Sequence, residues 1–526
     1  MEINKADKHT THTEEHHVLS GDKALKLWLK GKNAWNAWMY ANPNTDVSFE
    51  DVQFCLDNLA TQYPQYFQEQ IPLNGLELKT EKVICFDGFV FNGQVNFYHA
   101  KFKNPVSFNN AVFKGDVDFV KAVFLKDAHF SEVKFEQKAY FSEACFKTNV
   151  TFLNTTFSNS AVFDSASFCS NTDTAYHANF EHALFCENST FSNAHFFGKT
   201  SFSHSLFDDR VHFHESCFSE SAIFSNTTFK DNAFFTSSVF KKSIQFNSAN
   251  FCKKIEFENI QFDDALDFKN AKFACRFFFK PKGVPKQGGL DFRNAKFHYG
   301  ASLQGKFKFV PDLREINEDE LIDLSTLIVE PSIIYNFNSD INKENAQRLS
   351  KLTELARKYG IRYQQTVRFN AQTLKIKKWI GCNPLKILAI LSYSFISNYG
   401  QSIFRPFFFF VLSAVIFAQY TLSEAKPDKY AFNTSSAFTF LDKDIEKRLT
   451  WYDDMSDALN ISIANALPFS SYLMKKSEKS KTALFKAPKS KNHTLFSYIH
   501  SSLTIFFAFL IALAYRNRYF RQKKMR

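Results

Sequence analysis

The residue types that could do chemistry do not occur here in the spacings that catalysis needs. The sequence has no G-x-x-x-x-G-K-[ST] phosphate loop, no G-x-G-x-x-G dinucleotide turn, no H-E-x-x-H zinc motif and no G-x-S-x-G nucleophile turn. His12, His16 and His17 are close enough to share a metal, but they lie in a polar tail where we expect disorder. We therefore predict a protein that is not an enzyme, with no catalytic residue, metal or cofactor.

The other candidate site is an uncharged run at residues 458–474, between two long apolar stretches. Its amides and serines make it a poor lipid-facing helix, because unpaired polar groups are costly in hydrocarbon. It forms either a structural loop at the membrane interface or a re-entrant segment that lines a cavity. A third span is the remaining alternative.

The re-entrant interpretation predicts an order of span, pore segment and span, as in two-span ion channels. Three aspartates would then ring an outer mouth and attract cations in an oligomer. No T-V-G-Y-G filter is present, and such aspartates are more often part of a solvated loop. The candidate pore residues are Asp453, Asp454, Asp457, Asn460, Asn465, Pro468 and Phe469.

The dominant structural pattern of the sequence lies ahead of these residues and is formed by phenylalanine. The chain has 66 Phe in 526 residues, against 15 Gly and 13 Pro. From Phe86 to Phe279 the Phe recur in steps that alternate between 5 and 6 residues, with one rung missing near Thr174 and one residue inserted. A small or aliphatic residue stands two places before nearly every Phe, as expected for extended chain. Representative rungs are Phe108, Phe113, Phe119, Phe124, Phe163, Phe213 and Phe246.

This rhythm predicts a β-solenoid with Phe inside and polar residues outside. A helix would scatter the Phe around a spiral of 3.6 residues, and a flat sheet would send them to opposite faces. Four faces that average 5.5 residues make a coil of about 22 residues. The segment "AVFKGDVDFVKAVFLKDAHF" resembles the pentapeptide-repeat proteins with Phe at the centre of the repeat. That resemblance implies a right-handed quadrilateral β-helix.

Shorter strings resemble the membrane-bound members of that family. They are "GKNAWNAW" ahead of the repeats, then "SNYGQSIFRP", "NALPF" and "LAYRNRYF" towards the C-terminus. The fold is thus expected to be mainly β, with helical caps and a C-terminal helical membrane domain. An amphipathic helix from Asp22 to Ala41, with Leu25, Trp28, Trp35 and Trp38 on one side, would cap the open strand edges.

The domain order follows from these patterns. The expected boundaries are a disordered tail at 1–21, a helical cap at 22–80, the β-helix at 81–310, a helical linker or C-cap at 311–383 and a membrane domain at 384–526. The membrane spans are expected at about 403–422 and 494–515, since a bilayer helix needs about 17–25 apolar residues.

Charge and cysteine content indicate the compartment. Residues 298–526 carry 33 Lys and Arg against 19 Asp and Glu, whereas the repeat region is nearly neutral. Basic residues that flank membrane spans usually lie on the cytoplasmic side, which places both ends of the chain in the cytoplasm. A lysine-rich stretch at 475–491 would then lie on the outer side. Nine Cys without a C-x-x-C pair indicate reduced thiols, and the polar N-terminus predicts no cleavable signal peptide.

We therefore predict a bacterial inner-membrane protein, multi-pass, with the solenoid and both termini in the cytoplasm. The solenoid would be an interaction or sensing scaffold that displays a rigid surface to an unknown protein partner. The alternative is an oligomeric two-span channel that the solenoid regulates. The partners are then the bilayer and further copies of the chain, and no nucleic acid is expected. A soluble DNA mimic, an activity that the family resemblance implies for some members, is disfavoured by charge and anchorage.

Overall fold

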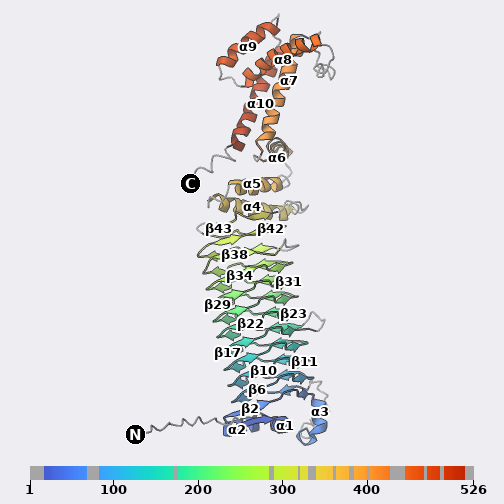
Figure 1. The fold of residues 1–526 in the computed structure, drawn as a ribbon, viewed down its shortest axis with the longest axis vertical. Coiled ribbons are helices and arrows are strands. Elements are labelled where there is room, and N and C mark those ends of the chain that lie inside the picture. Colours follow the sequence, from blue (N-terminus) through green and yellow to red (C-terminus); the bar gives the residue numbers. More distant parts are fainter. Residues whose placement is uncertain are drawn as a thin grey trace, which may run out of the picture. The chain divides into compact units, whose positions relative to one another are not determined.

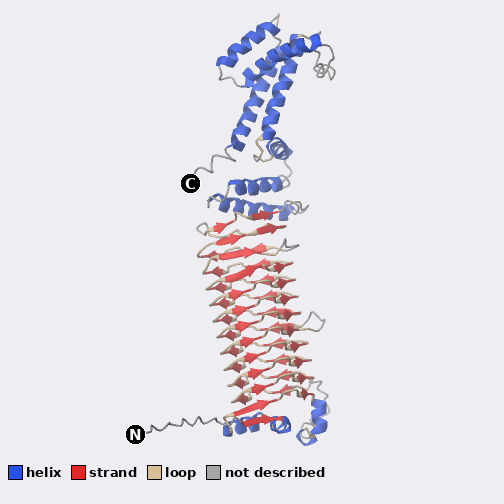
Figure 2. Cartoon of the chain, in the orientation of Figure 1, coloured by secondary structure: helices blue, strands red, loops and turns tan. Residues whose placement is uncertain are grey.

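The chain folds as a tall parallel solenoid followed by a separate helical unit. The computed structural model describes residues 17–67, 82–170, 176–282, 289–317, 320–329, 339–358, 363–377, 384–399, 402–426, 445–466, 471–485 and 491–515. Two compact units divide the chain, Met1–Tyr335 and Asn336–Arg526. Figure 1 shows the stacked strands of the first unit, and Figure 2 shows that the second is helical.

One coil of the solenoid consists of four short strands, one on each face, which turns connect. A representative coil contains β10 (Val117–Asp118), β11 (Val123–Phe124), β12 (Ala128–His129) and β13 (Lys134–Phe135). Each strand pairs in parallel with the strand four places on, so that Val117 lies opposite Ala139. The predicted coil of 22 residues is confirmed, because the pairing joins residues that far apart.

Repetition of this coil produces four sheets, which we name A to D in the order in which the chain visits them after β10. Sheet A has 13 strands, from β1 (His17–Ser20) to β43 (Ile322–Asp323). Sheet B has 9 strands, from β3 (Gln53–Phe54) to β35 (Gln261–Phe262). Sheets C and D have 10 strands each, from β4 (Ile84–Cys85) to β39 (Leu290–Asp291) and from β5 (Val90–Phe91) to β40 (Lys296–Phe297).

The alternation of five and six residues has its origin in two kinds of corner. In a five-residue step the N–H of Ala111 donates to the carbonyl of Phe108 at 2.9 Å, and Asn110 between them has a φ of 59°. This is the arrangement of a type II turn, in which the third residue must be left-handed. The same corner recurs after every second Phe, from His99 to Asn270, with φ between 55° and 62°. The regular six-residue corners among the described residues have no left-handed residue.

Phenylalanine rings fill the interior in continuous columns. The ring of Phe163 stacks on Phe141 at 4.8 Å and on Phe191 at 4.7 Å, with interplanar angles of 5° and 1°. Across the core the contact is edge to face, as between Phe119 and Phe130 at 5.7 Å and 86°. The seven representative rungs of the sequence analysis have no exposed surface. Ring spacing along a column therefore equals the spacing of hydrogen-bonded strands.

No rung is missing at residue 174, which corrects the sequence analysis. Phe168 stacks on Phe146 and Phe196, and Phe180 stacks on Phe152 and Phe202, so both are consecutive rungs. Twelve residues separate Phe168 from Phe180 where a regular step has six. A corner insertion of six residues thus leaves the columns in register. The sequence suggested a missing Phe because the insertion is about as long as one step between rungs. Only the stacking of the rings shows that Phe168 and Phe180 are neighbours.

The N-terminal residues contribute strands as well as a cap, so the expected start of the β-helix at residue 81 is wrong. The disordered tail predicted at 1–21 includes β1, which pairs with β2 (Thr45–Ser48), and β2 pairs with β6 (Val95–Asn96). Strand pairing starts early because Val47 faces inward opposite Val95. The cap predicted at 22–80 therefore contains both helices and the first strands.

The single helix predicted at the cap is two helices, α1 (Gly21–Leu29) and α2 (Lys32–Ala41). Gly31 separates them, with a φ of 85° that interrupts the helix. Trp28 and Trp35 are buried at the end of the core, and their Nε1 atoms donate to the carbonyls of Cys85 at 2.9 Å and Val90 at 3.0 Å. The short α3 (Leu56–Gln62) and a 3-10 turn (Pro64–Tyr66) follow β3.

The solenoid continues past its predicted end at residue 310. Sheet A reaches β43, and β42 (Gly305–Phe307) pairs with β44 (Leu327–Val329) although the Phe rhythm has lapsed. Leu303, Leu324 and Leu327 take inward positions there with no exposed surface. The boundary was placed too early because other apolar residues replace Phe in the last coil.

Seven helices are described in the second unit. The predicted helical hairpin around residue 360 corresponds to α4 (Ser339–Lys358) and α5 (Tyr363–Lys377), which pack together. After them come α6 (Pro384–Ser397), α7 (Phe404–Ala425), α8 (Ile445–Ala466), α9 (Ser471–Leu484) and α10 (Lys491–Tyr515). Helix α7 packs against α8 and α10, and α9 packs against α8.

Candidate functional site

Two helices in the second unit are long and apolar enough to cross a membrane, α7 and the part of α10 at 493–515. They correspond to the predicted spans. Large apolar side chains on both helices point away from the rest of the unit. On α7 they are Phe404, Phe407, Phe408, Val411, Leu412, Val415 and Ile416, and on α10 they include Leu495, Leu503, Ile505, Phe506 and Phe509.

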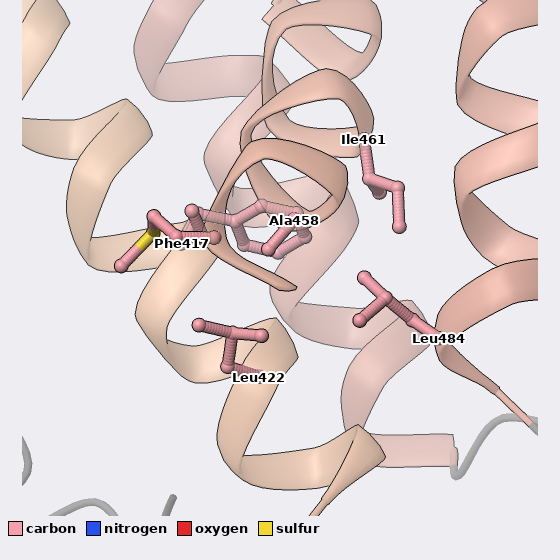
Figure 3. Close-up of a cluster of buried hydrophobic side chains, with 7 residues drawn as sticks. Phe417, Leu422, Ala458, Ile461 and Leu484 are labelled. Carbon is pink, nitrogen blue, oxygen red and sulfur yellow. The ribbon is translucent and has the colours of Figure 1, made fainter. Parts of the chain in front are cut away.

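A hydrophobic cluster joins α7, α8 and α9 at the C-terminal half of α7. Figure 3 shows Phe417 and Leu422 of α7 close to Ala458 and Ile461 of α8, with Leu484 of α9 on the same cluster. All five side chains are buried. Helix α8 is therefore held firmly against the candidate spans.

Two polar contacts fix the direction of α8. Lys426 Nζ, just beyond the end of α7, lies 2.5 Å from Oδ1 of Asp454. Further along, Ser462 Oγ donates to the carbonyl oxygen of Ala414 at 2.9 Å. Because Ala414 lies in the middle of α7, α8 runs antiparallel to α7 and reaches its midpoint.

The interior of the helical unit has a polar centre around His500 of α10. Its Nε2 lies 3.4 Å from Ser462 Oγ, and its ring stacks on Phe417 at 4.5 Å with an interplanar angle of 3°. Asn465 Nδ2 donates to Ser497 Oγ at 2.9 Å. His500 and Ser462 are buried, with 4% and 0% of their surface exposed. Apolar outward and polar inward is the reverse of the usual distribution in water-soluble bundles.

The predicted pore residues divide into several groups in the structure. Asp454 is paired with Lys426, while Asp453 is exposed. Asp457 accepts a hydrogen bond from Ser480 Oγ at 2.8 Å, and Asn460 Nδ2 donates to the same hydroxyl at 3.3 Å. Their assignment to a pore stays a prediction.

The segment predicted at 458–474 is helical where it is described. Residues 458–466 are the end of α8 and residues 471–474 begin α9. Pro468 and Phe469 lie outside the described residues. Both described ends of this stretch are therefore helical, and its role as an interfacial loop or a re-entrant segment stays a prediction.

Sequence reasoning missed several residues of this centre, including Lys426, Ser480 and His500. The pairing of Lys426 with Asp454 joins positions 28 residues apart, which no local pattern reveals. His500 did offer a signal, since an imidazole inside an apolar run of spanning length is a functional hypothesis by default.

A groove of about 440 Å³ runs between α7 and α10 on the side of the unit that carries their exposed apolar residues. Apolar side chains line most of it, including Ile416, Phe417, Ile499 and Leu503, and Tyr420 and His500 contribute polar atoms. Among the described residues of the chain, no group of three or more His, Cys, Asp or Glu is placed to hold a metal ion.

The solenoid surface carries ordered columns of outward side chains. On sheet A, His212 is half-buried and stacks on the ring of Phe234 at 4.6 Å and 7°. Burial, followed by the charge of Arg210, lowers the pKa of His212 from its usual value. Further along the same column, Glu256 and Phe278 border a depression of about 290 Å³.

Residues 139–240 carry a mild excess of acidic side chains, which ion pairs within the solenoid partly neutralise. Lys230 Nζ lies 2.5 Å from Asp208, and Arg210 Nε lies 3.9 Å from Asp231. These are two of the 4 basic residues in that stretch, against 10 acidic ones. The ion pairs use side chains from neighbouring coils and are largely exposed, so their contribution to stability is small.

The repeats themselves are recognised by comparison with known proteins. The family model for pentapeptide repeats matches 9 copies, with matched segments at residues 86–134 and 119–167. No significant match was found among curated proteins or among solved structures. The matched residues form successive coils in which Phe fills the interior and a corner follows each Phe. Residues 86–167 are therefore pentapeptide repeats, and the first unit that contains them is a parallel β-helix with four faces.

Proposed function

We propose that this chain is a non-enzymatic integral membrane protein whose pentapeptide-repeat solenoid is an interaction or sensing scaffold. Helices α7 and α10 anchor it in the bacterial inner membrane, and the solenoid and both termini lie in the cytoplasm. The solenoid suits this role because stacked coils present fixed columns of outward residues on four faces. Its partner is a protein that recognises such columns.

The observation that carries this proposal is the distribution of polarity in the second unit. Exposed leucines, phenylalanines and valines cover α7 and α10, whereas Ser462, Thr421, Thr504 and His500 are buried. Water would penalise such exposed surface by about 25 cal/mol per Å² of apolar area, and lipid would not. The positive-inside rule then places both helix ends that are rich in Lys and Arg in the cytoplasm.

Membrane anchoring is tested by extraction of cell membranes with alkaline carbonate. The full chain is expected to stay in the pellet, and a chain with Val411→Arg and Phe506→Arg, which places charge on both lipid-facing sides, is expected to lose this resistance. A matched control, Tyr299→Arg on the exposed solenoid surface, should remain in the pellet. Release of the unaltered chain into the supernatant would refute the anchor.

Topology is tested separately with right-side-out vesicles. The lysine-rich stretch at 475–491 lies between the two spans, so added protease is expected to cleave it from outside while the solenoid stays intact. Protection of that stretch, together with cleavage of the solenoid, would contradict the proposed orientation. The solenoid and the loop thus report on opposite sides of the membrane.

A second candidate function is an oligomeric pore with the solenoid as regulatory domain. The specific support is that α8 runs beside α7 as far as Ala414 and carries Asp457, Asn460 and Asn465 with it. If α7 crosses the bilayer, the end of α8 lies near its middle, where polar groups usually face other protein or water.

Ion flux from liposomes that contain the purified chain separates the two functions. A pore should dissipate an ion gradient across the vesicle membrane, which a trapped ion-sensitive dye reports. Asn465→Leu should alter that flux, whereas Ser502→Leu on the exposed side of α10 should not. No flux under any salt gradient would leave the scaffold as the function of the chain.

A further inference from the structure

Helix α6 carries an apolar stripe that is largely exposed, although the ring of Phe395 lies 5.2 Å from the ring of Phe409 in α7. The stripe consists of Leu385, Leu388, Leu391 and Phe395, whose side chains are 77%, 62%, 45% and 67% exposed. Their spacing of three or four residues places them along one side of the helix. At 14 residues α6 is too short to cross a bilayer.

The position of α6 follows from its junction with α7. Six residues separate Ser397, the end of α6, from Phe404, the start of α7. Arg405 Nη1 of α7 donates to the carbonyl oxygen of Ser394 at 3.5 Å. Figure 1 shows α6 end-on beside the start of α7, which runs lengthwise, so that α6 lies across the axis of the candidate span.

The chain around α6 is uniformly basic. Residues 355–423 contain nine Lys and Arg and no Asp or Glu. Lys377 and Arg405 are exposed on either side of α6, and Lys375 Nζ lies 5.5 Å from the ring of Tyr399, just beyond the end of α6. Basic residues near an anionic membrane surface are attracted to its acidic headgroups.

We propose that α6 is an interfacial helix that lies on the cytoplasmic surface of an anionic membrane with its apolar stripe in the lipid. This inference rests on the proposed anchoring of the chain by α7 and α10. A span that starts six residues after α6 keeps α6 at the bilayer surface, and a helix across that axis lies in the membrane plane. Lipid therefore covers the stripe, and the surrounding Lys and Arg contact the acidic headgroups.

The experiment uses the full chain in vesicles of equal parts phosphatidylglycerol and phosphatidylcholine, with the photo-crosslinker p-benzoylphenylalanine placed at single positions. Leu388 and Phe395 report on the stripe. Phe407, exposed on α7, reports on the span, and Tyr299, exposed on the solenoid, reports on water. Adducts are identified by mass spectrometry after illumination.

Phospholipid adducts at positions 388, 395 and 407 and none at 299 are the expected result. Adducts at 407 without adducts at 388 and 395 would overturn the interfacial role of α6 and leave the membrane anchor standing. Adducts to protein at 388 would show that a polypeptide covers the stripe, which also overturns the inference. The lack of a lipid adduct at 407 would instead refute the proposed anchor.

A second readout tests the acidic headgroups. Adducts to phosphatidylglycerol should outnumber adducts to phosphatidylcholine at least twofold at positions 388 and 395. Lys377→Gln combined with Arg405→Gln should reduce this enrichment, whereas Lys241→Gln on the exposed solenoid surface should leave it unchanged. Adducts that match the vesicle composition in the unaltered chain would overturn the preference for an anionic surface.

Discussion

Single residues at the corners decide how tightly each coil of the solenoid turns. Asn, the residue other than Gly that best tolerates a left-handed backbone, occupies several of these corners, but Glu, Ser, His and Lys occupy others. Each of those residues holds a conformation that an L side chain disfavours, and the stacked hydrogen bonds of the coil compensate for it. The corners are therefore places where stability can be gained.

Glu143→Gly is expected to stabilise the solenoid. Glu143 is exposed and has a φ of 57°, so glycine relieves a left-handed backbone at the cost of some chain entropy, with a net gain of about 0.5–1 kcal/mol. The measurement is hydrogen exchange of the solenoid in the full chain at increasing urea. Glu136→Gly, at an exposed position that is not left-handed, should destabilise by a similar amount. Equal effects of both variants would contradict the turn assignment.

The histidine in the sheet A column makes solenoid stability depend on pH. The pKa of His212 is lowered from 6.5, chiefly by burial. The unfolded chain thus gains a proton at a higher pH than the folded chain, and stability is lost as the pH falls below about 6.5. His212→Phe removes the titrating imidazole and keeps an aromatic ring stacked on Phe234.

We expect the loss of stability between about pH 7.5 and pH 5 to be smaller in His212→Phe than in the unaltered chain. Urea midpoints of the solenoid at the two pH values measure it. His214→Phe, on an exposed neighbour, is the control for the added ring and should retain the original difference. An identical pH dependence in His212→Phe would show that this imidazole is not held neutral by burial.

At the scale of elements, the solenoid is a set of four sheets whose strands are mostly two residues long. Such strands have little stability alone, and the columns of stacked rings hold them in register. The corner insertion between Phe168 and Phe180 illustrates this, because six added residues leave the rings on both sides stacked at 4.6–5.4 Å. The solenoid therefore tolerates inserted residues at its corners, whereas the stacked rings of its interior leave no room for such changes.

Phe163→Ala in the middle of the solenoid should remove about 3–5 kcal/mol of stability, the usual cost of a large cavity. Its ring has no exposed surface and loses stacking contacts with both Phe141 and Phe191. Phe197→Ala, at a ring that is 42% exposed, should cost about 1 kcal/mol or less. Comparable urea midpoints for the two variants would be incompatible with an interior of continuous ring columns.

The helical unit uses its elements differently. Helix α8 joins the two candidate spans through Ser462, which contacts the carbonyl of Ala414 and approaches His500. Its partner α9 shares Ser480 with Asp457 and Asn460. These contacts are polar and directional, so they specify an arrangement of helices that apolar packing alone would leave loosely defined.

At the scale of the whole molecule, the two units have separate cores and opposite surfaces. The solenoid buries apolar rings and exposes polar residues, whereas the helical unit exposes apolar residues on α7 and α10. The basic excess of the sequence falls entirely in the second unit, where residues 336–526 carry 30 Lys and Arg against 12 Asp and Glu. This division explains why one chain combines a water-exposed β-helix with helices suited to lipid.

A chain that ends at Tyr335 is expected to fold and to remain soluble without detergent. The first unit includes the whole Phe interior and the capping helices α1 and α2. Circular dichroism should show β-structure, and gel filtration should show a discrete species. The complementary chain of residues 336–526 should need detergent. Aggregation of the first unit alone would show that its last coil requires cover from the helical unit.

The sequence by itself determined the solenoid, its 22-residue coil and the inward direction of the Phe rungs, since a strict rhythm of fives and sixes is a local signal that few folds satisfy. It also determined the two apolar helices, because length and composition suffice for them. It misplaced both ends of the solenoid, where Val, Leu and Trp replace Phe. It also joined α1 and α2 into one helix, because a single residue, Gly31, decides the break.

The tertiary structure alone decided which polar residues meet. Lys426 with Asp454, Ser462 with Ala414 and Asn465 with Ser497 join segments 28 to 48 residues apart. No pattern along the chain encodes such pairings, which depend on the order and direction of packed helices. The solenoid can thus be predicted from its sequence because the same contacts repeat in every coil. The polar contacts of the helical unit occur once each and depend on how its helices pack.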